Sequence, residues 1–119
     1  MMKVIIPLDE DKTSVCVAFG RTPMFLAYNL ETKESEILAN PGAQAEGGAG
    51  IKAAQAVVDS GAQVLITPRC GENAAEVFQA AGIKIYKSHG SDAMENIAAF
   101  EAGNLEELTH FHAGYHGIR

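Results

Sequence analysis

The sequence has 119 residues, of which 47% are hydrophobic and 20% charged, and its formal net charge is −6. This length allows one compact domain, and the acidic balance disfavours nonspecific nucleic-acid binding and docking on an anionic membrane, because both need a basic surface. No stretch approaches the roughly 20 apolar residues of a membrane span, and no signal-peptide pattern is present, so we expect a cytoplasmic protein.

The first forty residues predict three strands of an antiparallel meander. Consecutive apolar residues indicate a central strand over residues 2–8, and segments 24–29 and 34–39 form a hairpin around a polar turn. The segment 14–19 is either a short strand or an extended loop. The charges in 34–39 are typical of an edge strand, where they oppose aggregation.

A glycine- and alanine-rich loop over residues 40–50 (NPGAQAEGGAG) follows the meander. A helix is then expected over 51–60, where Ile51, Ala54 and Val57 recur on one apolar face. Gly61 ends this helix.

The stretch from Gly61 to Tyr86 predicts a βαβ unit. A short apolar strand over 64–67 leads through a loop to a helix over 74–81, which Gly82 ends before the next strand. The two strands should be parallel neighbours, and the loop between them lies at the edge of the sheet where α/β proteins bind ligands.

A third helix follows, capped by Ser91 or Asp92, and Asp92 with Glu95 fits the capping-box pattern. A further turn of helix is expected over 105–108. The predicted order is β-β-β-α-β-α-β-α, a single α/β domain with a five-stranded mixed sheet flanked by helices. We assign the domain to residues 1–108 and a histidine-containing tail to 109–119.

Three segments carry a joint motif: FGRTPMFLAYNLET (19–32), GGAGIKAAQAVVDSGAQVLIT (47–67) and CGENAAEVFQAAGIKIY (70–86). In order and spacing they resemble the dinitrogenase iron–molybdenum cofactor biosynthesis family, small proteins that bind and carry iron–sulfur or molybdenum-containing cluster precursors. The resemblance implies a ribonuclease H-like fold. It also implies a nitrogen fixation-related carrier without turnover of its own, which works between metallocluster donor and acceptor proteins.

The resemblance points to loop residues that would converge on one end of the sheet. Glycine loops let backbone amides approach an anionic cluster, and arginine side chains supply charge-assisted hydrogen bonds. We therefore expect the cluster to be bound by Arg21, Gly47, Gly48, Gly50, Arg69, Cys70 and Gly71.

The two cysteines are far apart in the sequence, so a cluster would be held mostly without covalent ligands or shared with a partner. Cys70 lies at a helix start, where the dipole and Arg69 are expected to lower its pKa and favour a thiolate ligand. The alternative is a small buried residue. Cys16 is expected to be buried, and both are expected to be thiols rather than a disulfide.

The histidines offer a separate metal hypothesis. His110, His112 and His116 place three imidazoles within seven residues, a pattern that suits zinc, nickel or copper, unless the tail is simply solvated. His89 follows a strand end and is expected to reach the same rim as the loops.

Two alternatives to the carrier remain: a small α/β module that binds an anionic metabolite at the loop rim, and a mononuclear metal protein acting through the histidine tail. Enzymatic activity is not expected. A two-metal nuclease needs carboxylates on the central strands, which 4–8 and 64–67 lack. No G-x-S-x-G elbow is present, and GGAG is not followed by the G-K-[ST] of a phosphate loop.

Overall fold

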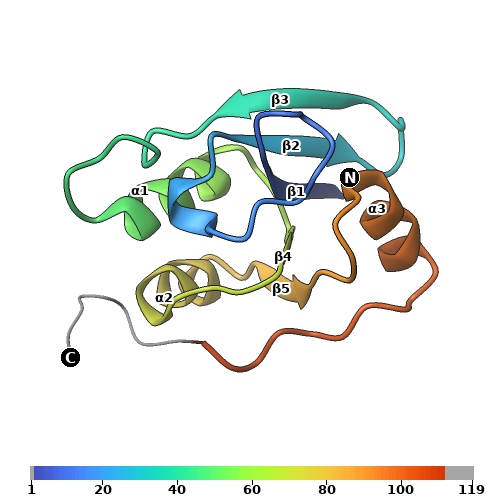
Figure 1. The fold of residues 1–119 in the computed structure, drawn as a ribbon. Coiled ribbons are helices and arrows are strands. Elements are labelled where there is room, and N and C mark those ends of the chain that lie inside the picture. Colours follow the sequence, from blue (N-terminus) through green and yellow to red (C-terminus); the bar gives the residue numbers. More distant parts are fainter. Residues whose placement is uncertain (1, 112–119) are drawn as a thin grey trace.

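The computed structural model describes residues 2–111, which form a five-stranded sheet with helices packed on it (Figure 1). The sheet order is β3-β2-β1-β4-β5. The elements are β1 (Lys3–Leu8), the 3-10 helix η1 (Phe19–Arg21), β2 (Met24–Asn29), β3 (Ser35–Ala39), α1 (Ala49–Asp59), β4 (Val64–Thr67), α2 (Glu72–Ala80), β5 (Lys84–Lys87) and α3 (Ala93–Glu101).

The sheet is mixed, as the sequence predicts. β1 pairs antiparallel with β2 and parallel with β4, while β2 with β3 is antiparallel and β4 with β5 is parallel. The consecutive apolar residues Val4, Ile5 and Ile6 are fully buried because β1 lies in the middle of the sheet with helices over both faces.

Alternate residues of the strands divide the core into two clusters. On one face Ile5 and Leu65 pack with Phe78 of α2 and with the buried side of α1. On the other face Ile6 and Ile66 pack with Ile97 of α3. The expected α/β domain with helices on both sheet faces is therefore confirmed.

Residues 14–19 form no strand of the sheet, which agrees with the extended-loop alternative: Val15 makes only an isolated bridge to Leu8, and the chain then turns into η1. One local expectation is wrong. Residues 105–108 form no helical turn. Instead, they run antiparallel along β5, where Leu108 N–H donates to Ile85 O at 2.8 Å, because an edge strand offers unpaired backbone groups.

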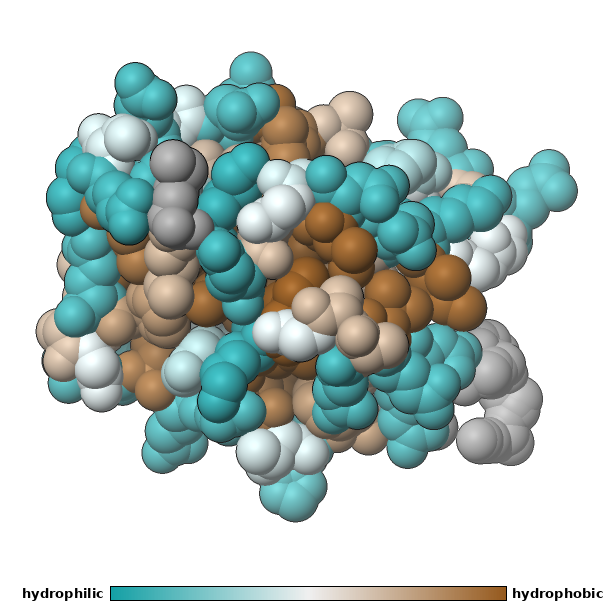
Figure 2. All heavy atoms as spheres, turned by 180° about the vertical axis from the view of Figure 1, so that it is seen from behind, coloured by the Kyte–Doolittle hydropathy of each residue, from teal (hydrophilic) through white to brown (hydrophobic). Residues whose placement is uncertain are grey.

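Hydrophobic residues also reach the surface. Figure 2 shows them gathered in the middle of the face behind the view of Figure 1, with hydrophilic residues around them. Two large exposed hydrophobic side chains, Val17 and Ile51, belong to the site described below. Within residues 2–111, no helix is long and apolar enough to cross a bilayer.

Candidate functional site

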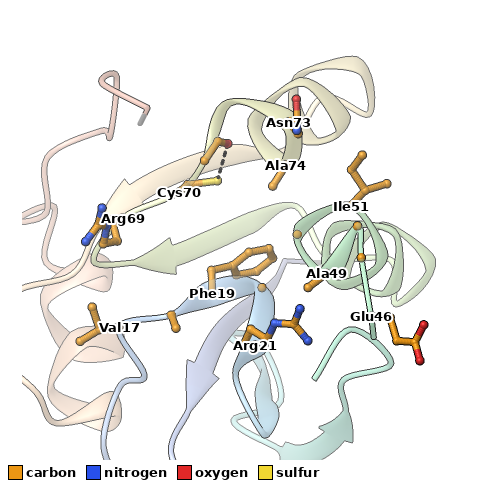
Figure 3. Close-up of a pocket in the computed structure, with 16 residues that line it drawn as sticks. Val17, Phe19, Arg21, Glu46, Ala49, Ile51, Arg69, Cys70, Asn73 and Ala74 are labelled. Atoms are coloured by element: carbon orange, nitrogen blue, oxygen red, sulfur yellow. Dashed lines mark hydrogen bonds between the residues drawn. The ribbon is translucent and has the colours of Figure 1, made fainter. Parts of the chain in front are cut away.

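An open pocket of about 800 Å³ lies where η1, the start of α1 and the loop between β4 and α2 meet (Figure 3). All seven residues that the sequence predicts for cluster binding line it: Arg21, Gly47, Gly48, Gly50, Arg69, Cys70 and Gly71. Three segments that are far apart in the sequence thus meet at one site, as expected for loops at one end of an α/β sheet.

Both α1 and α2 begin at this pocket. The N-cap of α1 is Gly48, in the left-handed conformation with φ 68°, and the N-cap of α2 is Gly71. Neither glycine has a side chain to cap its helix, and the first intrahelical bonds start only at Lys52 and Ala75. The first turns of two helices, whose free amides carry partial positive charge, therefore lie at the site.

Close packing of backbone holds the two helix starts together. A Cβ atom added to Gly50 would lie 3.9 Å from the Cβ of Ala74, so the first turns of α1 and α2 are neighbours. A Cβ on Gly20 would lie 3.0 Å from the backbone N of Gly50, so a side chain where η1 meets α1 would require the backbone to shift. Gly47 and Gly48 have open space beside them, so their backbone stays accessible.

Phe19 forms the floor of the pocket (Figure 3). It is buried, and its ring lies 5.5 Å from that of Phe78 and 5.7 Å from that of Phe25. These ring contacts fix η1 to the core on the α1–α2 side of the sheet.

Cys70 lines the pocket but is almost fully buried, and its Sγ lies 3.5 Å from Gly71 O (Figure 3). Burial raises the pKa of its thiol to about 12. The expected lowering of this pKa is wrong, because desolvation of a thiolate outweighs the helix dipole and an arginine whose side chain is exposed. Cys70 is thus a neutral thiol at physiological pH.

Cys16 is also buried, and burial raises its pKa too. It does not line the pocket. Both cysteines are free thiols, as expected.

The two arginines occupy different ends of the pocket. Arg69 lies beside Val17, whereas the Arg21 guanidinium points toward the start of α1 and Glu46 (Figure 3). Arg21 Nη1 donates to the carbonyl oxygens of Ala43 and Ala45. Arg21 therefore contacts its own chain as well as the pocket, which the sequence did not reveal.

The two described histidines do not line this pocket. His89 is exposed, and its backbone N–H donates to Asn96 Oδ1 of α3 at 2.7 Å. His110 is exposed and does not line the pocket, while His112 and His116 lie outside the described residues. Within residues 2–111, no three His, Cys, Asp or Glu side chains are grouped to hold a metal ion.

The pocket also has an apolar part that the sequence analysis missed. Ile51 was expected on the buried face of its helix, but it is 46% exposed, because it lies in the first turn of α1 where the open pocket begins. Ala54 and Val57 are buried as expected. Val17 is 58% exposed at the other end. The glycine pair before α1 was the signal that the helix begins inside the loop, with Ile51 in its first turn.

A model of the family described as "Dinitrogenase iron-molybdenum cofactor" matches residues 2–103. The chain belongs to this family. The resemblance noted in the sequence is thereby confirmed, and the match includes every residue that lines the pocket. No functionally curated protein matches the sequence significantly.

Solved structures share the fold. The apo form of the orange protein from Desulfovibrio gigas superposes with a TM-score of 0.85 at 29% identity, over 92% of this chain and 94% of that one. A Thermotoga protein described as a candidate NifB protein gives 0.78 at 37% identity, over 97% and 100%. A candidate dinitrogenase from Methanocaldococcus jannaschii gives 0.74 at 23% identity, over 91% and 95%, which supports the fold alone.

Proposed function

We propose that this protein binds an anionic iron–sulfur or molybdenum-containing cluster in the pocket and carries it between donor and acceptor proteins. One observation carries the proposal: two helix N-termini with glycine caps meet at a pocket that also contains Arg21 and Arg69. Backbone amides, helix dipoles and guanidinium groups all favour an anion at the same place. Family membership supports cluster chemistry for that anion.

The donor set fits a cluster held mainly without covalent bonds. Cys70 is the one thiol among the described lining residues, and it would have to lose its proton at a raised pKa before it could ligate iron. A cluster that brings its own sulfide ligands needs only amides and guanidinium groups around it. Such binding is reversible, as a carrier requires.

The lining gives little means for catalysis. Among the described residues of the pocket, Glu46 is the one carboxylate and no histidine is present, so general acid–base pairs are not assembled there. We therefore propose a non-catalytic role. With its acidic composition and reduced thiols, we place this role in the cytoplasm.

The test is anaerobic purification of untagged protein from its native host, followed by metal and sulfide analysis and a visible spectrum. Iron with sulfide, or molybdenum, near one cluster per chain with a charge-transfer band is the expected result. Colourless, metal-free protein that also fails to take up a synthetic iron–sulfur cluster and tetrathiomolybdate would overturn the proposal. It would favour a module that binds an anionic metabolite.

A Cys70→Ala variant then distinguishes a cluster held by amides and arginines from one ligated by the Cys70 thiolate. Uptake within about threefold of wild type is expected if amides and arginines hold the cluster. Loss of uptake by a folded variant would show that the thiolate is a ligand despite its raised pKa.

A further inference from the structure

A strap, residues 40–48, joins β3 to α1, and its last three residues, Glu46, Gly47 and Gly48, line the pocket. Asn40 anchors its beginning, because Nδ2 donates to Gly20 O at 3.1 Å and Thr22 O at 2.9 Å while Oδ1 accepts from Gly42 N–H at 2.8 Å. Asn40 is buried, and all of its amide atoms are thereby paired with backbone. This end of the strap is fixed to the chain around η1.

The middle of the strap is held differently. Ala43 and Ala45 have small side chains, and their amides make only local turns, to Asn40 O at 3.1 Å and Gly42 O at 3.2 Å. Their carbonyl oxygens accept hydrogen bonds from Arg21 Nη1. The hydrogen bonds that join this part of the strap to η1 thus come from the exposed guanidinium of Arg21.

The same guanidinium lines the pocket, so an anion there and the strap carbonyls compete for it. A guanidinium is attracted to an anion by a full opposite charge, which a neutral carbonyl oxygen does not offer. We propose that Arg21 is a positioning residue that holds the strap against η1 and is drawn from the strap to the cargo when an anionic cluster binds. The second half of this statement rests on the proposed function, whereas the first half does not.

Thermodynamic linkage relates the position of the strap to the affinity of the pocket for cargo. If cargo loosens the strap, then a strap that is already displaced must bind cargo more tightly, by the same factor. Gly42 offers the means, because a Cβ there would collide with Ala49 O and lie 2.9 Å from Gly20 O while leaving Arg21 intact. Gly42→Ala should therefore displace the strap and free the guanidinium.

The first experiment needs no cargo. Hydrogen exchange of the strap amides is measured in wild type, Arg21→Gln and Arg69→Gln, with β1 and β4 as internal references. Arg21→Gln should speed strap exchange about tenfold, whereas Arg69→Gln, which removes the other pocket arginine, should leave it unchanged. Equal strap exchange in all three proteins, or equal acceleration by both variants, would overturn the positioning role.

The second experiment titrates tetrathiomolybdate into the same proteins and into Gly42→Ala, with Asn40→Ala as a second strap variant. Arg21→Gln should bind at least tenfold more weakly, Gly42→Ala and Asn40→Ala about fivefold more tightly, and cargo should speed strap exchange in wild type. Two results would contradict the transfer of Arg21 from the strap to the cargo. One is weaker tetrathiomolybdate binding by both folded strap variants, and the other is slower hydrogen exchange of the strap amides when cargo binds. If wild type binds no anion, the proposed function fails and the cargo-free comparison alone decides the role of Arg21.

Discussion

The N-termini of the three helices are built in two different ways. At α3 the Asp92 carboxylate accepts from Glu95 N–H at 2.9 Å, and Ala93 N–H donates to Thr13 O at 2.9 Å. At α1 and α2 the caps are Gly48 and Gly71, which have no side chain to offer. The first-turn amides of α3, on one face of the sheet, therefore have hydrogen-bond acceptors within the protein. On the other face, α1 and α2 start at the pocket without a side-chain cap.

This difference separates structural from functional helix starts within one chain. A side-chain cap stabilises a protein by about 1 kcal/mol relative to alanine but by only a few tenths relative to glycine, so its omission at two neighbouring helices has a small cost. The omission is useful where an anion replaces the cap. Each variant below changes either the side-chain-capped N-terminus of α3 with its supporting turn or the glycine-capped N-terminus of α2.

The largest expected effect lies at the N-terminus of α3, which is capped by a side chain. Asn96 is fully buried, its Oδ1 accepts from His89 N–H and its Nδ2 donates to Asp92 O at 2.9 Å. Asn96→Ala leaves His89 N–H unpaired and removes one of the two hydrogen bonds to Asp92 O, which also accepts from the Asn96 backbone N–H. The variant should lower the free energy of unfolding by about 2 kcal/mol. Urea unfolding measures this loss, and cargo uptake by the folded protein should not change.

The matched control for that variant is Asn73→Ala, which removes an exposed asparagine from the first turn of α2. Its effect on unfolding should stay within about 0.5 kcal/mol. If both variants lose the same stability, the two kinds of helix start do not differ as described.

The next largest effect is expected at the N-terminus of α2, which is capped by a glycine. Gly71→Asp places a carboxylate cap at α2, where the backbone is already extended with φ −77° and ψ 161°. Its charge would compete with an anionic cargo, so binding of tetrathiomolybdate should weaken at least tenfold, or about 1.4 kcal/mol, while stability rises by a few tenths of a kcal/mol. Gly71→Asn, a cap without charge, should weaken binding less, and equal effects of the two variants would argue against an anion site.

Removing the side-chain cap of α3 should have a smaller effect. Asp92→Ala is expected to lower the free energy of unfolding by about 1 kcal/mol and to leave cargo binding within about twofold of wild type. Paired urea unfolding and titration curves test both statements. A loss of binding as large as that of Gly71→Asp would mean that α3 also contributes to the site.

The smallest effect concerns pH and the turn that supports α3. Asp11 accepts hydrogen bonds from the Ser14 hydroxyl and from the Thr13 and Ser14 amides, which lower its pKa from 3.8 to about 2. A depressed pKa contributes stability that is present above about pH 4 and is lost as pH falls toward 2. Asp11→Asn should therefore be slightly less stable than wild type at pH 7 and equal to it near pH 2, by urea unfolding at both values. A difference that persists at pH 2 would contradict this assignment.

Much of the fold follows from local patterns. The apolar run at Val4 predicts a central strand, Gly82 ends α2 with φ 77°, and Asp92 caps α3 as its capping-box pattern predicts. The mixed sheet follows from strand and helix order, because parallel strands need a crossover and adjacent strands form hairpins. The seven predicted binding residues line one pocket because loops after parallel strands meet at one edge of the sheet.

The properties of the individual site residues could not be predicted in the same way. The pKa of Cys70 depends on how deeply the thiol is buried, and the helix start that suggested a thiolate says nothing about that depth. The hydrogen bonds of Arg21 join residues that are 22 and 24 positions apart, and only the folded strap brings them together. The backbone of His89 is bonded to Asn96 of α3, a contact that depends on how β5 and α3 pack and not on the neighbours of His89 in the chain.

The sequence by itself determined the family, the order of strands and helices, and the residues that gather at the pocket, because glycine positions and hydrophobic periodicity are local properties of the chain. The tertiary structure decided that burial raises the pKa of Cys70, that Arg21 donates hydrogen bonds to the strap, and that residues 105–108 cover the edge of β5. These properties depend on burial and on unpaired backbone groups, and both exist only after distant segments have packed together.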